Sequence, residues 1–583
     1  WNELETGGTP GEVPELVRRQ ESTRLDYIIP AGFVFLVVAV VGCYALSKTW
    51  STGSRNSTAD LKAFGRLPVV YQGRVKPFDT LARNSLRVIS DKDSYLDEDG
   101  KRQPAIRWLL DEITGSPQAG THRVFRIENL DVQRELDLDR RKGLRYSFEE
   151  IAPRLQEFSK QVELARKTPP ERLSVFQKKV RQLHNRIQAY LGLRKAHMLM
   201  PELSQDKKPT IDVVDAVMRL RELTDERSQL PLAVPSPDHE WEPLALASAR
   251  DWCRQWSRSS GDDSATEIAS SLARGIVASK DPQIERTIHD QVIATITNIL
   301  QSTPDGRGKN ERELRELAEE RWKALPAAMK TQLSAPTQRE LEQGLARQLA
   351  SVLVLIIGDE GLKQPASEAY QGLANIFEAW KTDEAGTFNS EVERLIKLNR
   401  QQPPKDFSAS RVSFEHHFNH LSPFFFAGAL YVLIFVLVCG SWLGWTVPLN
   451  RAASWLMVAT FLLHTYGLVA RMYISERPPV TNLYSSAIFI GWGGVIAGMI
   501  IERVYRMGIG NVIGASAGFA TMTIAHILAA DGDTFSVLVA VLDTQFWLAT
   551  HVVCITQGYT STYVAGLLGV LFILRGVLTP SLS

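Results

Sequence analysis

Long apolar runs occur once near the N-terminus of the chain and repeatedly in its last third, and a long charged segment separates them. A helix that crosses a bilayer needs about 20 predominantly apolar residues. Six segments meet this requirement: Tyr27–Leu46, Phe424–Trp445, Ser454–Ala470, Tyr484–Ile501, Val512–Ala530 and Val553–Leu574. The pattern therefore predicts an all-α polytopic membrane protein with about six transmembrane helices.

The two ends of the chain lead to separate expectations. The first apolar run is longer than that of a secretory signal peptide, and the letters YALSKTW form a poor cleavage site, so we expect an uncleaved anchor. The chain begins with Trp1 rather than Met, and Ser583 follows closely on a predicted span. We therefore expect a fragment of a longer protein.

The segment between the first and second spans, residues 51–422, is predicted to be one large, mainly helical domain. The letters YSFEEIAPRLQEFSKQVELARK place Ser147 and Glu150 at the spacing of a capping box, which begins a helix. After Pro169–Pro170, apolar residues recur at helical spacing: Phe176, Val180, Leu183, Ile187 and Tyr190. Two helices around a proline break predict a helical hairpin. This segment contains no glycine-rich phosphate loop, nucleophile elbow or paired metal motif.

Net charge and cysteine spacing exclude several functions. A net charge of +1 for 583 residues is not the basic footprint of a nucleic-acid-binding protein, so no nucleic acid is expected as a partner. The four cysteines form no CxxC pair, which argues against a zinc site or a thioredoxin-like motif. The sequence also lacks CxxCH, so the chain does not carry covalently attached haem.

The distribution of arginine among the short loops predicts the orientation in the membrane, because basic loops stay inside. Arginines occur in Glu502–Gly508, at Arg451 and at Arg575, whereas the loop Asp531–Thr550 has three aspartates and no basic residue. The acidic loop is therefore expected outside. One basic loop, residues 471–482, opposes this assignment but is outnumbered.

This orientation divides the chain into four parts. They are a cytoplasmic segment 1–26, a transmembrane anchor 27–46, an extracytoplasmic and mainly helical domain 51–422, and a transmembrane bundle 423–583. The letters EHHFNH precede the bundle and place His416 and His420 one helical turn apart. Such a pair can bind a metal, but a polar collar at the headgroup level is the favoured interpretation.

Ionisable side chains inside a membrane are costly and often functional. His464, His526 and His551 lie in or beside predicted spans, with Arg471 and Trp547 near the same outer level. Imidazoles, aromatic planes and arginine suit a flat apolar ligand with acidic groups, such as haem. The alternative is an ordinary interfacial belt, in which these aromatic residues bind no ligand.

The letters HTYGLVARMYISERPPVTNLYSS, residues 464–486, resemble the signature of the CcsA (ResC) family of haem-handling membrane proteins, which act in system II cytochrome c biogenesis. Five residues fit that signature: His464, Arg471, Pro479, Asn482 and Tyr484. Ser485 stands where the family usually has glutamate, which leaves the role of that acid in doubt. The letters FWLATHVVCITQGYTSTYVAGLLG are similar to the family's segment around its first external histidine, and AHILAADGD is similar to the piece before it.

A further stretch, Phe64–Ser90, looks like the start of the outer domain in large fused forms of this system. The resemblance covers Phe64–Ser90 and Leu421–Leu578, and little between them. It implies that haem b is presented at the outer face, between two external histidines and a tryptophan-rich segment, and is then joined to apocytochrome c. His551 matches the first external histidine and would be an axial ligand of the haem iron.

The resemblance also implies the partners and the compartment. We expect apocytochrome c, a CcsB/ResB-like subunit, haem and the lipid of a bacterial cytoplasmic membrane, with the protein as a possible part of a cytochrome c synthase. The tryptophan-rich segment and the second external histidine would lie beyond Ser583. This chain alone would then hold half of the haem site and bind haem weakly.

Two other functions fit the same pattern of spans. A transporter would use His464 and His526 in a substrate or proton path, and inverted repeats or broken helices would support it. A receptor would bind a ligand with residues 51–422 and would need an inner signalling module. Neither feature is evident in the sequence.

The loop charges make the orientation testable. A reporter enzyme that is active only outside the cytoplasm should be active when fused within residues 51–422 and inactive when fused near Arg506, because basic loops are retained inside. The opposite pair of activities would contradict the predicted orientation and place His551 on the wrong face.

Overall fold

The computed structural model describes residues 25–49, 58–200, 211–225, 231–235, 240–279, 281–304, 307, 309–357, 362, 367–535 and 545–578. The predicted cytoplasmic segment 1–26 and the centre of the predicted acidic loop lie largely outside these residues. The chain divides into two compact units. The first, here called the membrane unit, comprises residues 1–50, 417–529 and 533–583, and the second, the large domain, comprises residues 51–416 and 530–532.

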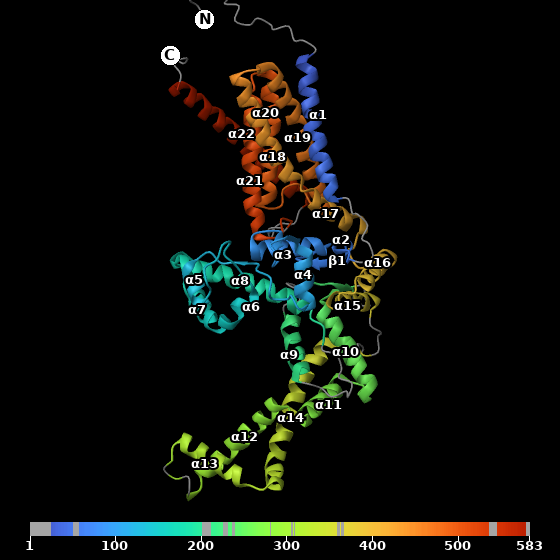
Figure 1. The fold of residues 1–583 in the computed structure, drawn as a ribbon, viewed down its shortest axis with the longest axis vertical. Coiled ribbons are helices and arrows are strands. Elements are labelled where there is room, and N and C mark those ends of the chain that lie inside the picture. Colours follow the sequence, from blue (N-terminus) through green and yellow to red (C-terminus); the bar gives the residue numbers. More distant parts are fainter. Residues whose placement is uncertain are drawn as a thin grey trace, which may run out of the picture. The chain divides into compact units, whose positions relative to one another are not determined.

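The membrane unit is a group of long helices (Figure 1). They are α1 (Leu25–Thr49), α18 (Pro423–Leu443), α19 (Thr446–Ser475), α20 (Leu483–Tyr505), α21 (Ile509–Leu528) and α22 (Gln545–Leu578). Five helices are long and apolar enough to cross a membrane among the described residues, and each contains or overlaps a predicted span. The sixth predicted span, Val553–Leu574, lies within α22 and stays a prediction as a membrane crossing.

Helix α19 is longer than the predicted span Ser454–Ala470, because the polar letters before it continue the helix. Asn450 and Ser454 form hydrogen bonds with side chains of other helices. Asn450 Nδ2 donates to Glu502 Oε1 at 2.8 Å, and Asn511 Nδ2 donates to Ser454 Oγ at 2.8 Å. Glu502 also accepts the backbone N–H of Gly508 at 3.0 Å, so this buried carboxyl group stabilises the turn between α20 and α21.

Helices α20 and α21 approach each other closely through glycines. A Cβ atom on Gly498 would lie 2.6 Å from the carbonyl oxygen of Gly510, and one on Gly494 would lie 2.9 Å from Ala517 Cβ. A Cβ on Gly491 would lie 2.0 Å from Thr521 Oγ1. Small residues at such spacing allow helix backbones to pack closely in membranes, where burial of apolar surface drives association weakly.

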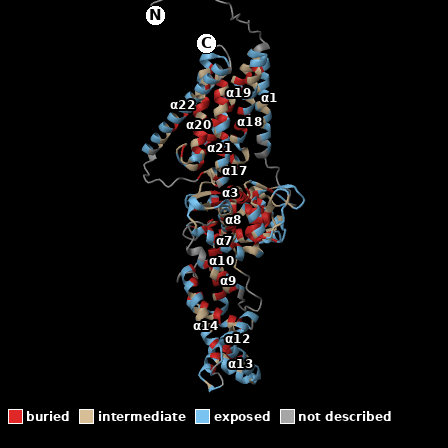
Figure 2. Cartoon of the chain, turned by 90° about the vertical axis from the view of Figure 1, so that its left-hand side faces the viewer, coloured by how far each residue is buried: buried red, intermediate tan, exposed pale blue. Residues whose placement is uncertain are grey.

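The other helices of the membrane unit pack around α20 and α21. Tyr431 of α18 lies over Gly518 of α21, where a Cβ would be 2.6 Å from the Tyr431 ring. Helix α1 contacts α19 and packs Val34, Val37 and Val41 against the core of the bundle. Buried positions are frequent along α19 to α21, whereas α1 is mostly exposed (Figure 2). A helix this apolar and this exposed fits a lipid environment.

The large domain is mainly helical. Its first half contains α2 (Leu61–Phe64), β1 (Pro68–Tyr71), β2 (Arg74–Pro77), α3 (Phe78–Ser90), β3 (Ser94–Leu96), β4 (Arg102–Pro104), α4 (Ala105–Thr114), β5 (Phe125–Arg126), α5 (Leu130–Glu135), β6 (Arg145–Tyr146), α6 (Phe148–Ile151), α7 (Leu155–Lys167) and α8 (Val175–Ala196). Its second half contains α9 (Ile211–Asp225), β7 (Val234–Pro235), β8 (Trp241–Glu242), α10 (Leu244–Ser260), α11 (Ala265–Ala278), α12 (Pro282–Gln301), α13 (Glu311–Ala324), α14 (Ala327–Ile357), α15 (Glu368–Lys381), α16 (Ala385–Gln401) and the start of α17 (Ala409–Leu421). Consecutive strands pair antiparallel as β1–β2, β3–β4, β5–β6 and β7–β8.

The predicted capping box and helical hairpin are confirmed. Ser147 and Glu150 exchange both bonds of a capping box at the start of α6, and α7 follows after a short 3-10 turn. Helix α8 buries Val180, Leu183 and Ile187 and packs on α7. The short strand pairs were not predicted, because two- to four-residue strands leave too little alternation to detect.

Replacement of Gly498 by alanine should destabilise the membrane unit by about 1–3 kcal/mol, because its Cβ would meet the Gly510 backbone, which cannot rotate away. The measurement is thermal unfolding of the purified protein in detergent. Gly566→Ala in α22 is the matched control, since a Cβ there meets nothing within 4 Å. Equal unfolding temperatures for the two variants would contradict the close helix contact.

Candidate functional site

His464 is buried at the centre of the membrane unit, with no exposed surface. Its Nδ1 lies 2.9 Å from the Tyr431 hydroxyl of α18, and its Nε2 lies 3.2 Å from the Ile488 carbonyl oxygen of α20. A carbonyl oxygen only accepts, so Nε2 donates to Ile488, and Nδ1 forms a hydrogen bond with the Tyr431 hydroxyl. His464 thereby links three helices.

Arg471 lies two turns after His464 on the same face of α19 and is also buried. Its Nη1 donates to Thr534 Oγ1 at 3.0 Å and its Nη2 donates to the Thr534 carbonyl oxygen at 2.6 Å. The guanidinium carbon lies 4.6 Å from the centre of the Tyr484 ring and 4.1 Å from that of Phe535. Arg471 therefore holds the segment after α21 by hydrogen bonds and by cation–π contacts.

Asn482 also binds Thr534, and it is the N-cap residue of α20. Its Nδ2 donates to the Thr534 carbonyl oxygen at 2.9 Å, and its Oδ1 accepts the Ser485 backbone N–H at 2.9 Å. The Ser485 hydroxyl in turn accepts the backbone N–H of Asn482 at 2.9 Å. This is a capping box, in which the third position is commonly glutamate or glutamine. Ser485 thus takes the capping role at the position where the CcsA family usually has glutamate.

Four of the five signature residues therefore lie in the interior of the bundle or at its edge: His464, Arg471, Asn482 and Tyr484. Arg471, Asn482 and Tyr484 surround Thr534 and its neighbour Phe535, and His464 is buried deeper on α19. Tyr431 and Thr534 were not predicted. Nothing in the local sequence distinguishes Tyr431 from other aromatic residues in apolar spans, and a backbone acceptor such as Thr534 leaves no sequence signal.

The other three predicted site residues are exposed. His526 lies near the end of α21, and Trp547 and His551 lie one turn apart near the start of α22. Trp547 is 71% exposed. Residues four apart on a helix are neighbours on its surface, so Trp547 and His551 form an exposed aromatic and imidazole pair.

The part of α22 that follows His551 is anchored on α20. Val552 and Val553 pack against a core that includes Ile488 and Phe489. Thr560 Oγ1 lies 3.4 Å from the Ile490 carbonyl oxygen, and Gln557 lies over Gly493, where a Cβ would be 2.6 Å from Gln557 Oε1. The His551 backbone is thus held in place while its side chain stays accessible.

In the large domain, the stretch Phe64–Ser90 supplies an ion-pair network. Arg74 forms a two-pronged ion pair with Glu415 of α17, and Thr80 Oγ1 donates to Glu415 Oε1 at 2.9 Å. Asp79 Oδ2 accepts from Arg83 Nε at 2.7 Å. Burial alone would lower the pKa of Arg83, but Asp79 more than offsets this and the pKa is raised. The network fixes the first turns of α17.

His416 belongs to this network. It is 4% exposed, and its Nδ1 lies 4.0 Å from Asp79 Oδ2. A collar at the headgroup level would leave this side chain exposed, so the favoured interpretation of His416 is wrong. The histidine is instead buried next to an acidic group that also binds Arg83.

Several known proteins similar to part of this chain are named cytochrome c biogenesis protein CcsA. Protein NrfI of Wolinella succinogenes is 34% identical over 127 residues, which are 21% of this chain and 14% of that protein. Cytochrome c biogenesis protein CcsA of Prochlorococcus marinus subsp. pastoris is 30% identical over 130 residues, 21% of this chain and 41% of CcsA. CcsA of Pyropia yezoensis is 29% identical over 164 residues, 27% of this chain and 49% of CcsA.

These similarities extend over about a fifth to a quarter of the chain and less than half of each relative. No protein-family model matches the chain. Part of the chain is thus CcsA-like, and its apolar helices are those of a membrane protein.

Arg471→Gln should lower the stability of the membrane unit by roughly 3–6 kcal/mol, because a hydrogen bond to a charged group contributes about 1.5–3 kcal/mol and Thr534 accepts two from Arg471. Thermal unfolding in detergent measures this loss. Arg477→Gln removes the same charge from an exposed position and should have little effect. Similar unfolding temperatures for the two variants would show that the Thr534 contacts do not stabilise the bundle.

Proposed function

We propose that this chain is the haem-handling part of a cytochrome c biogenesis protein, which holds haem b at the outer face of the membrane and delivers it to apocytochrome c. The observation that carries this proposal is the exposed pair of Trp547 and His551 on a helix anchored to a CcsA-like bundle. An accessible imidazole can bind iron, and an adjacent aromatic plane can pack against a macrocycle. The CcsA relatives, which are named for cytochrome c biogenesis, support the same process.

The predicted site residues would have different roles in holding haem. His551 would supply one axial nitrogen and Trp547 an apolar surface, while Arg471 would contribute a positive charge that favours propionates. His464 has both ring nitrogens engaged with Tyr431 and Ile488, so its part would be to hold the helices together. His526 is exposed and could serve as a further ligand. The bound haem supplies the vinyl groups that react with reduced cysteines, and the protein positions it.

The partners and the compartment follow from the same proposal. The large domain would lie on the extracytoplasmic side of a bacterial cytoplasmic membrane and receive apocytochrome c or a CcsB/ResB-like subunit. The acidic residues of the loop before His551 and the arginines of Glu502–Gly508 support this orientation. The alternative of a transporter with interrupted spans has less support, because α18, α19, α20 and α21 are each continuous helices.

Replacement of His551 by alanine tests the proposal in cells that depend on this protein for c-type cytochromes. Assembly of c-type cytochromes, measured by haem staining, should fall severely while the amount of membrane-inserted protein stays near normal, because the side chain is exposed and contributes little to folding. Added imidazole should partly restore assembly, since it can supply the missing nitrogen to the iron.

The matched control is His417→Ala, which removes another exposed histidine from α17. It should leave cytochrome assembly unchanged. Normal assembly in His551→Ala would end the assignment of His551 as a ligand. An interfacial histidine that only makes a hydrogen bond would contribute about 0.5–1.5 kcal/mol and could not cause a severe loss.

A further inference from the structure

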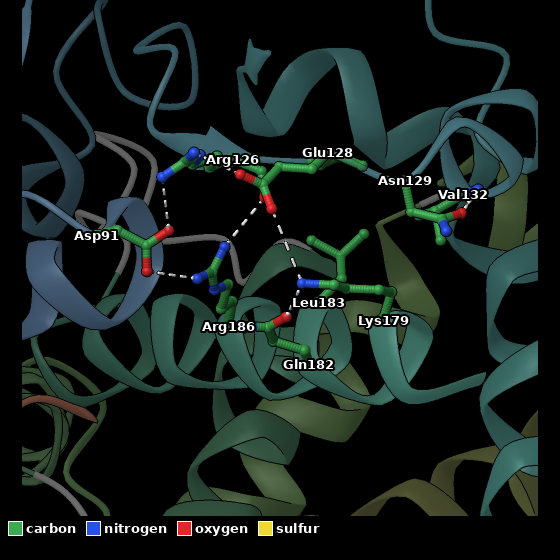
Figure 3. Close-up of a pocket in the computed structure, with 10 residues that line it drawn as sticks. Asp91, Arg126, Glu128, Asn129, Val132, Lys179, Gln182, Leu183 and Arg186 are labelled. Atoms are coloured by element: carbon green, nitrogen blue, oxygen red, sulfur yellow. Dashed lines mark hydrogen bonds and ion pairs between the residues drawn. The ribbon is translucent and has the colours of Figure 1, made fainter. Parts of the chain in front are cut away.

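The large domain contains a polar cavity that takes no part in the proposed haem site. Its volume is about 70 Å³, and its charged lining comes from Asp91, Arg126, Glu128, Lys179 and Arg186 (Figure 3). A cavity needs roughly 10–15 Å³ to hold one water molecule. This one therefore has room for several waters or for one small polar group.

Arg186 of α8 is the most deeply buried of these charged residues, with 8% of its side chain exposed. Its Nη2 lies 2.7 Å from Asp91 Oδ1, and its Nη1 donates to the Arg126 carbonyl oxygen at 3.0 Å. The side chains of Arg126, Glu128 and Lys179 are about 40% exposed. The cavity thus has one buried arginine and a more open charged rim.

A further arginine lies near the cavity without being part of its lining. Arg145 of β6 is the cross-strand partner of Arg126 of β5. Like charges opposite each other on paired strands destabilise a hairpin. Arg145 donates to Ser90 Oγ at 2.7 Å and to the Val124 carbonyl oxygen at 3.4 Å, and within the described residues it makes no ion pair with a carboxylate. Burial lowers the pKa of Arg145, and the nearby charges of Arg126 and Arg186 add to this effect.

The charges around the cavity do not balance. The lining has three cations, Arg126, Lys179 and Arg186, and the two carboxylates of Asp91 and Glu128, and Arg145 opposite Arg126 brings the local excess to two positive charges. Asp91 is shared between Arg126 and Arg186, and Glu128 between Arg126 and Lys179. An excess of positive charge in a partly desolvated place is costly, and an added anion would offset that cost.

We propose that this cavity binds a small anionic group, a carboxylate or a phosphate, through Arg126 and Arg186, with Arg145 adding positive charge nearby. Arginine suits both groups because its planar fork donates two parallel hydrogen bonds. The group could belong to a free solute or to an acidic side chain of a bound peptide. Glu128 competes for the same cations and is the residue that an incoming anion would displace.

The test uses the whole purified chain in detergent, titrated with sodium phosphate, sodium succinate or a tri-aspartate peptide against chloride at constant ionic strength. Affinity is measured by calorimetry, and saturable binding is expected. Arg145→Gln should weaken the binding several-fold, since it removes one nearby positive charge, and Glu128→Gln should strengthen it several-fold. Arg134→Gln is the matched control, because it removes a positive charge from a side chain that is 78% exposed.

Each outcome decides between the possibilities. Tighter binding of phosphate or succinate than of the peptide would support the site and identify a free anion as its ligand, whereas the reverse order would support the site and identify an acidic peptide. Equal affinities in Arg145→Gln, Glu128→Gln and Arg134→Gln, or an effect that follows ionic strength alone, would overturn the proposal. Glu128→Gln keeps the test decisive if Arg145→Gln fails to fold.

Discussion

The close contact between α20 and α21 is the constraint on which the membrane unit depends. Glycines at 491, 494, 498 and 510 let the two helices approach more closely than larger residues would allow, and the other helices are arranged around that pair. Tyr431 reaches across Gly518 to His464, the turn at Glu502 closes one end, and α22 rests on Gly493. Because membrane helices associate through packing and hydrogen bonds rather than through burial of apolar surface, this fit at the centre determines where each polar group can find a partner.

Polar groups within the bundle are costly unless they are paired. His464 is paired with Tyr431 and Ile488, Arg471 with Thr534, and Glu502 with Asn450 and Gly508. Through these bonds the interior polar residues hold the helices together at the ends and at the middle of the bundle. The exposed imidazole of His551 differs from them, because the apolar neighbours that follow it hold the backbone while the ring faces outward. A group available to a ligand and a scaffold that fixes its position are what a haem-handling site requires.

Charged residues of the large domain are arranged in two different ways. Arg74 of β2 forms an ion pair with Glu415 of α17, so the stretch that resembles the outer-domain start is bound to this helix. Helix α17 directly precedes α18 in the chain. The cavity beside Arg186 has the opposite character, because its cations outnumber its carboxylates. In the first case each charge has a nearby counter-charge, which indicates a structural role. At the cavity beside Arg186 an excess of positive charge remains, which supports the proposed anionic ligand.

The sequence by itself determined the long apolar helices, the helical nature of the large domain and the local start signals such as Ser147 with Glu150, because these depend on composition and on spacings of three or four residues. It also pointed to His464, Arg471, Asn482 and Tyr484 through a short signature. Only the tertiary structure separated buried His464 and Arg471 from exposed His526, Trp547 and His551, since a residue on an apolar helix can face either a neighbour or lipid. It alone revealed the roles of Tyr431, the Thr534 carbonyl and Arg145, because backbone acceptors and cross-strand partners are chosen by contacts between residues far apart in the chain, and these leave no periodic trace in the sequence.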